Sequence, residues 1–314
     1  MAGQMTPGSS SNKPWRQVYG LSIASDLDLP ELHAAPTADA PDIRIEQGAV
    51  PELTERDPNN VRAYVDGEPG HLVLDFPDKL RVLVSQGTTI TYSRYPGATD
   101  SELRLYMLGS AMGAILMQRG HIVVHGNALV LPQFDGAAIC IGDSGAGKST
   151  TAIAMMQRGY RILADDVCPI TAEGIALSGM PRAKMWDDTA QQLRIDTSSL
   201  ARLRLDEAKF DLPLDPSQRG EPEPARAFFE LVPEDVDEVS VSPLSGTQKF
   251  MTLRNNIYRP EYLLPLKLEA EYLQRVAKIA ASTPIFRVTR PTQGFDIDSV
   301  LDAILETAER HSAV

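Results

Sequence analysis

Residues 136–166 read GAAICIGDSGAGKSTTAIAMMQRGYRILADD, and this stretch decides the fold. The apolar run at 137–141 predicts a buried strand, and residues 149–158 predict an amphipathic helix that ends at Gly159. A second apolar run at 160–164 predicts another strand. A strand, a glycine-rich loop, a helix and a further strand in this order are typical of α/β proteins, so we expect an α/β core.

The glycine-rich loop carries the strongest chemical signal. Residues Gly142 to Ser149 fit the pattern G-x-x-x-x-G-K-[ST]. The backbone N–H groups of such a loop point toward a phosphate, and the following helix adds its positive N-terminal end. Lys148 is expected to contact the β- and γ-phosphates of ATP, and the Ser149 hydroxyl to ligate Mg²⁺. The predicted nucleotide-binding residues are Gly142, Asp143, Ser144, Gly145, Ala146, Gly147, Lys148, Ser149 and Thr150.

Two adjacent carboxylates, Asp165 and Asp166, follow the strand after this helix. Open α/β sheets bind their ligands at the carboxyl ends of their strands, which is where this pair is expected. One carboxylate can hold Mg²⁺ and the other can accept a proton from an attacking hydroxyl. A turn capped by aspartate is the alternative, and the nearby phosphate-binding loop favours the catalytic interpretation.

His125 lies inside an apolar segment, 121–131, that predicts a strand. A single histidine in such a strand is more often a packed core residue than a catalytic one. This strand is expected to neighbour the strand that precedes the phosphate-binding loop. We therefore keep His125 as a candidate catalytic residue.

These motifs together resemble a known family. His125-Gly126, the loop at 142–149, the Arg-Gly-Tyr-Arg turn at 158–161 and Ala-Asp-Asp at 164–166 resemble the catalytic domain of HPr kinase/phosphorylase. The resemblance is dense over 121–170 and faint beyond. It implies a P-loop kinase core of the HPr kinase/PEP-carboxykinase-like type that uses ATP and Mg²⁺ to phosphorylate a protein serine.

The resemblance also implies roles for individual residues. Lys148 would bind phosphate, Ser149 would ligate Mg²⁺, His125 would assist catalysis and Asp166 would accept the proton. Asp165 is then expected to serve mainly as a metal ligand.

One segment departs from the bifunctional enzymes of that family. Residues 178–193, SGMPRAKMWDDTAQQL, lack the metal-binding glutamate and the signature that is tied to the phosphorylase reaction. They resemble a divergent HPr-kinase-like group found in lasso-peptide and other peptide-modification gene clusters. This resemblance implies a kinase with little or no phosphorylase activity, whose acceptor is a serine of a peptide or small protein such as a lasso-peptide precursor.

Outside the core the chain shows a different pattern. The alternating runs at 71–76 and 80–84 predict antiparallel strands, and 100–120 predicts a helix that leads toward His125. We expect the acceptor to enter where the N-terminal region meets the catalytic part. The expected organisation is a disordered tail at 1–13, a smaller β-rich N-terminal domain at 14–99, and a catalytic domain at 100–314 that is joined to it by helix 100–120.

Composition excludes several classes of partner. The 314 residues include 42 acidic and 30 basic side chains, a net charge of −12, which disfavours binding to nucleic acid or anionic membranes. No run reaches the roughly 18 apolar residues of a membrane span. Cys140 and Cys168 lie in apolar strands, as buried thiols of a reducing compartment do. We expect a cytoplasmic protein, and a homo-oligomer is compatible with the sequence.

Two other functions remain open at this point: a small-molecule hydroxyl kinase on the same scaffold, and a non-catalytic nucleotide-binding regulatory module. The intact acid pair argues against the second. Trp186 is expected to pack in the core, and the segment 200–208 to form a charged helix. Secondary candidates for contacts to anions are Arg182, Lys184, Lys209, Arg254, Arg259, Arg287 and Arg290.

Overall fold

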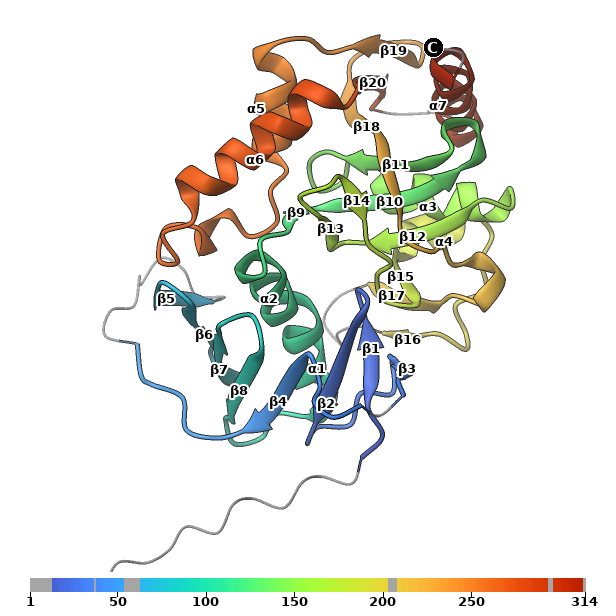
Figure 1. Ribbon diagram of the computed structural model, residues 1–314. Coiled ribbons are helices and arrows are strands. Elements are labelled where there is room, and N and C mark those ends of the chain that lie inside the picture. Colours follow the sequence, from blue (N-terminus) through green and yellow to red (C-terminus); the bar gives the residue numbers. More distant parts are fainter. Residues whose placement is uncertain (1–12, 37, 54–62, 203–207, 293–295, 313–314) are drawn as a thin grey trace, which may run out of the picture.

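The computed structural model describes residues 13–36, 38–53, 63–202, 208–292 and 296–312. Over this part of the chain it is a mixed α/β protein with three sheets (Figure 1). Apart from Lys13, the tail expected at 1–13 lies outside the described residues.

The N-terminal sheet has eight described strands in the order β3-β1-β2-β4-β8-β7-β6-β5. Its strands β6 and β7 confirm the alternating runs expected at 71–76 and 80–84. The strands are β1 (Arg16–Val18), β2 (Leu21–Ser25), β3 (His33–Ala34), β4 (Ile43–Gln47), β5 (Tyr64–Glu68), β6 (His71–Phe76), β7 (Leu80–Ser85) and β8 (Thr89–Arg94).

The central sheet carries the phosphate-binding loop. Its nine described strands are β9 (Ile122–Val124), β10 (Gly126–Leu131), β11 (Gly136–Ile141), β12 (Arg161–Asp165), β13 (Cys168–Ile170), β14 (Ile175–Ala176), β18 (Glu223–Glu234), β19 (Ser240–Pro243) and β20 (Ile285–Pro291). The strand β11 lies between β10, which is antiparallel to it, and β18, which is parallel. A third sheet contains β15 (Arg182–Trp186), β16 (Ala201–Arg202) and β17 (Lys209–Pro213).

The helices include those expected at 100–120 and 149–158. They are α1 (Asp100–Tyr106), α2 (Met112–Gln118), α3 (Lys148–Gln157), α4 (Asp187–Gln192), α5 (Thr247–Asn255), α6 (Glu269–Ser282) and α7 (Ile297–Ser312). A π-helical turn at Met107–Ala111 joins α1 to α2, so the segment expected as one helix is continuous. By contrast, the described start of the segment 200–208 is the strand β16 and not a helix.

Two strands of the central sheet are interrupted at the same level. The segment expected as one strand divides at His125 into β9 and β10, and β12 divides from β13 around Asp166. Since β9 pairs with β13 and β10 pairs with β12, the two breaks face each other. Asp166 has a left-handed backbone, with φ of +68°. The interruptions bring the two polar side chains together at the carboxyl end of β12.

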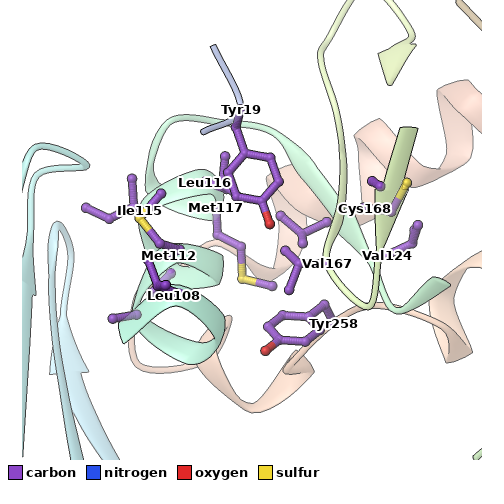
Figure 2. Packing of buried hydrophobic residues seen from close by; sticks show 14 of the residues in the cluster. Tyr19, Leu108, Met112, Ile115, Leu116, Met117, Val124, Val167, Cys168 and Tyr258 are labelled. Carbon is purple, nitrogen blue, oxygen red and sulfur yellow. The ribbon is translucent and has the colours of Figure 1, made fainter. Parts of the chain in front are cut away.

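The apolar core crosses from the N-terminal sheet to the central sheet. One cluster of buried side chains includes residues of both sheets and almost the whole of α2, and α1 and α2 lie between the N-terminal sheet and the rest of the chain (Figure 1). Figure 2 shows Tyr19, from the turn after β1, among Met117, Val167 and Tyr258. A second cluster on the other face of the central sheet surrounds α3 and α7.

Among the described residues, no helix is both long and apolar enough to span a lipid bilayer.

Candidate active site

The phosphate-binding loop joins β11 to α3 in the expected conformation. Gly142 has φ of +139°, and a Cβ placed there would lie 2.6 Å from the Leu231 carbonyl oxygen, so only glycine fits. Gly147 precedes α3 with φ of +101°. The Lys148 Nζ donates to the carbonyl oxygens of Gly142 at 2.7 Å and Asp143 at 3.0 Å. The lysine therefore lies folded over the start of its own loop.

Arg290 holds the loop from outside. Its guanidinium is buried and donates from Nε to the Ala146 carbonyl at 3.0 Å and from Nη2 to the Gly145 carbonyl at 3.2 Å. The expectation that Arg290 binds an anion is therefore replaced by a structural role, because its donors are directed at backbone carbonyls. Arg287 likewise pairs with Glu230, at 2.8 Å.

A cavity of about 120 Å³ lies against the inner side of the loop. It brings together His125, Lys148, Ser149 and the Asp165–Asp166 pair, which the sequence placed in one site. Its other lining residues are Asn127, Ser144, Gly145, Gly147, Thr150, Lys184, Trp186, Asp188, Thr189 and Lys209. Three predicted loop residues do not line this cavity. The side chain of Ala146 is buried, and Gly142 and Asp143 line a neighbouring cavity.

Asp166 is held as an ionised carboxylate. The Lys184 Nζ donates to its Oδ2 at 2.5 Å, and His125 Nδ1 lies 3.5 Å from its Oδ1. Burial opposes ionisation, but the charge and the hydrogen bond of Lys184 outweigh burial and lower the pKa of Asp166 well below its ordinary value. Burial also lowers the pKa of His125, so its ring is neutral at pH 7. The site thus keeps one charged acceptor of hydrogen bonds beside the loop.

Asp165 has the opposite character. Its carboxylate accepts hydrogen bonds from the Asn127 side chain and, at 2.5 Å, from the Lys184 backbone N–H. Burial and the adjacent charge of Asp166 nevertheless raise its pKa to about 6. A buried carboxylate whose charge is this poorly compensated is a suitable ligand for a cation.

The residues present fit Mg²⁺ shared with a nucleotide. Ser149 and Asp165 line the same cavity and offer a hydroxyl and a carboxylate oxygen, which are the hard ligands that Mg²⁺ prefers. Over the described residues there is no group of three or more His, Cys, Asp or Glu side chains that could hold a metal by themselves. Phosphate oxygens and water would therefore complete the coordination, as is usual where Mg²⁺ binds with a nucleotide.

Two residues that the sequence analysis did not place in the catalytic machinery organise the site. Asn256 is buried; its Oδ1 accepts from the Gly142 N–H at 2.8 Å, and its carbonyl accepts from the His125 N–H at 2.8 Å. It thereby joins the end of α5 to both the loop and the strand break. Lys184 was only a secondary candidate. Because it lies two residues before Trp186 in the strand β15, the two side chains are on the same face of that strand, and this spacing was the only signal in the sequence.

The other basic candidates and Trp186 have distinct positions. Arg182 is buried and pairs with Asp211 at 2.7 Å, so it is structural. Trp186 is 41% exposed, which corrects its expected place in the core. It lines the cavity because β15 ends there, and the Lys209 Nζ lies 5.0 Å from its ring centre. Arg254 is exposed on α5 and lines neither the first cavity nor the second.

A second cavity, of about 640 Å³, adjoins the first and shares His125, Ser144, Asp166 and Lys209 with it. Its outer wall is the segment 255–261, which begins at the last residue of α5. No described residue of the N-terminal sheet lines either cavity. The N-terminal sheet instead borders a separate cavity, beside Tyr19 and Arg219.

The raised pKa of Asp165 predicts how stability depends on pH. Since its folded pKa of about 6 exceeds the ordinary 3.8, folding takes up a proton between these values and stability is lost as pH rises through them. Asp165→Asn cannot titrate. In the absence of metal, the difference in unfolding free energy should move in favour of this variant by about 2 kcal/mol between pH 4 and pH 7.

Urea unfolding followed by circular dichroism, with EDTA present, measures this difference. The hydrogen bond lost in the variant shifts its stability equally at each pH, so the pH-dependent part isolates the titration. Asp166 titrates below this window because its pKa is lowered. Parallel stability curves for the two proteins would contradict the assignment.

Comparison with known proteins identifies no family for this chain. No family model matches it, and no curated protein matches it. Among solved structures it is similar to the Hpr(Ser) kinase/phosphatase from Coxiella burnetii, at 13% sequence identity over 61% of this chain and 97% of that chain, with a TM-score of 0.32. At that TM-score the similarity does not establish a shared fold, so function has to be inferred from the site itself.

Proposed function

We propose that this protein is an ATP-dependent kinase that transfers the γ-phosphoryl group to a hydroxyl, most consistently a serine of a peptide or small protein. One observation carries the proposal. Lys148 and Ser149 of a complete phosphate-binding loop face the same cavity as the Asp165–Asp166 pair. A nucleotide-binding module without transfer activity has no need of a charged acceptor of hydrogen bonds at that position.

The transfer step makes modest demands on the protein. The acceptor oxygen forms a bond to the γ-phosphorus, the bond from that phosphorus to its bridging oxygen breaks, ADP leaves, and the hydroxyl proton passes to Asp166. Because the transition state is loose, positioning and charge neutralisation dominate catalysis. Bound Mg²⁺ would supply charge neutralisation at the phosphates.

The residues of the site then have defined roles. Lys148 contacts the β- and γ-phosphates, Lys184 holds the carboxylate of Asp166 in place, and the His125 ring contacts the Asp166 backbone carbonyl. The low pKa of Asp166 makes it a weak base before reaction. A carboxylate with such a low pKa can first orient the acceptor hydroxyl and then accept its proton after the bond to phosphorus has begun to form.

The second cavity provides the acceptor side. It reaches His125 and Asp166 from the segment 255–261, and its volume of about 640 Å³ is within the range of sites for small ligands and short peptides. We therefore place the acceptor there and no longer at the junction with the N-terminal sheet. The cytoplasmic location and the narrower peptide class inferred from the sequence belong to this proposal.

Incubation with γ-labelled ATP and Mg²⁺ tests the proposal. A library of serine peptides and a set of small hydroxyl compounds serve as acceptors, and label transfer is compared with ATP hydrolysis. We expect transfer to peptide. Transfer only to small hydroxyl compounds would favour the small-molecule kinase. Nucleotide binding with neither transfer nor hydrolysis would identify a regulatory module.

The phosphorylase signature is missing at 178–193. Incubation of the phosphorylated product with excess phosphate should therefore not release pyrophosphate.

A further inference from the structure

The acceptor-side cavity contains two cationic side chains from separate elements. Lys209 comes from β17 and Arg259 from the turn after α5. The carboxylates that line it are Asp143, Asp166 and Glu261. Asp166 is already compensated by Lys184, and Asp143 belongs to the exposed part of the phosphate-binding loop. The outer wall is therefore dominated by Arg259 and the glutamate beside it.

The backbone holds Arg259 in an unusual conformation. Its φ is +48°, in the left-handed region that residues with a side chain rarely adopt. The neighbours fix this conformation, because the Tyr258 N–H donates to the Val123 carbonyl at 2.9 Å and the Tyr262 N–H donates to the Arg259 carbonyl at 3.0 Å. Strained residues of this kind concentrate at functional sites.

The Arg259 side chain is hydrogen-bonded to Tyr258 but is not fully covered. It is 42% exposed, and its guanidinium carbon lies 5.7 Å from the centre of the Tyr258 ring. Its ion-pair partner is Glu261, at 3.6 Å, a distance too long for a hydrogen bond. An incoming carboxylate can thus replace Glu261 and gain the two parallel hydrogen bonds that a guanidinium offers.

We propose that this cavity selects acceptor peptides that carry a carboxylate near the phosphorylated hydroxyl, and that Arg259 binds that carboxylate. Lys209, which lines both cavities, adds positive charge between this contact and the phosphates. The inference rests on the proposed kinase function and names the class of its acceptor. The net charge of −12 repels acidic peptides at long range, so the attraction is local to these two side chains.

Matched serine peptides test the proposal. Four peptides differ only in Glu or Gln beside the serine and in a free or amidated C-terminus, so that they distinguish a side-chain carboxylate from a terminal one. For each we would measure KM and kcat for transfer and, without ATP, binding by fluorescence anisotropy. We expect the peptides with the preferred carboxylate to have about tenfold lower KM, since a hydrogen bond to a charged group is worth that much or more.

Three variants assign the effect to its residue. Arg259→Gln should reduce the preference to within about twofold and leave kcat nearly unchanged, because Arg259 does not line the cavity that holds Lys148 and the Asp165–Asp166 pair. Glu261→Gln should lower KM for the acidic peptides, because it removes the internal competitor. Arg254→Gln, an exposed arginine on the same stretch of chain, is the matched control and should have no effect.

The possible results separate the two proposals. Transfer without any preference for a carboxylate would overturn the carboxylate site, and so would a preference that remains in Arg259→Gln. Neither result would contradict the proposed kinase activity. Carboxylate-dependent binding that Arg259→Gln abolishes, with no transfer to any peptide, would support the carboxylate site and overturn the proposed peptide kinase.

Discussion

Replacing Lys148 by alanine is expected to lower the rate of phosphoryl transfer by about 10²–10³-fold. The Nζ of Lys148 is the charge nearest to the expected β- and γ-phosphates, and removing one such preorganised contact typically costs about 3–4 kcal/mol in the transition state. In the protein without ligand this amine is bonded to two loop carbonyls. The variant should therefore keep the fold while its loop loses two hydrogen bonds.

Initial rates of label transfer at saturating ATP measure the effect, and circular dichroism checks the fold. Lys278→Ala is a suitable control, because that lysine lies on α6 and donates to the Ala172 carbonyl, outside the two cavities. A Lys148→Ala protein with nearly normal turnover would show that the loop does not bind the transferred phosphate.

Asp166→Asn is the second substitution with a large expected effect. The amide can still accept a hydrogen bond from Lys184, so the local packing is preserved, but it cannot take the proton of the acceptor. Turnover should fall about 10²–10⁴-fold while nucleotide affinity changes little. Nucleotide affinity can be measured by calorimetry on the same samples.

Asp165→Asn provides the contrast within the same pair. Because Asp165 is assigned to the metal, its variant should require more Mg²⁺ for half-maximal rate. Titration of Mg²⁺ at fixed ATP compares the two variants. If Asp165→Asn lost turnover at a normal Mg²⁺ requirement while Asp166→Asn kept its turnover, the two roles would have to be exchanged.

Local patterns were sufficient to predict much of the phosphate side of the site. The apolar run of β11, the glycines of the loop and the capping of α3 all act within a few residues, so the sequence specifies them directly. The same holds for β6 and β7, whose alternation matches one buried face. Asp165 and Asp166 were found because they follow the next strand of the same local unit.

The remaining parts of the site depend on contacts between distant segments. Asn256 reaches Gly142 across 114 residues, and no local pattern marks that hydrogen bond. Lys184 meets Asp166 only because β15 packs against the end of β12, and the pairing of Trp186 with Lys209 depends on the register of β15 and β17. The strand breaks at His125 and Asp166 are likewise visible only once the two strands are paired.

The apolar cluster that crosses from the N-terminal sheet to the central sheet bears on how this molecule moves. Two bodies that share one buried core cannot rotate apart without exposing apolar surface, so the N-terminal sheet is not a hinged lobe. The three-stranded sheet that carries Lys184 and Trp186 is held in the same way, because its Ala183, Met185 and Phe210 belong to the second buried cluster. Global unfolding, for the same reason, should proceed in a single cooperative transition that includes the N-terminal sheet.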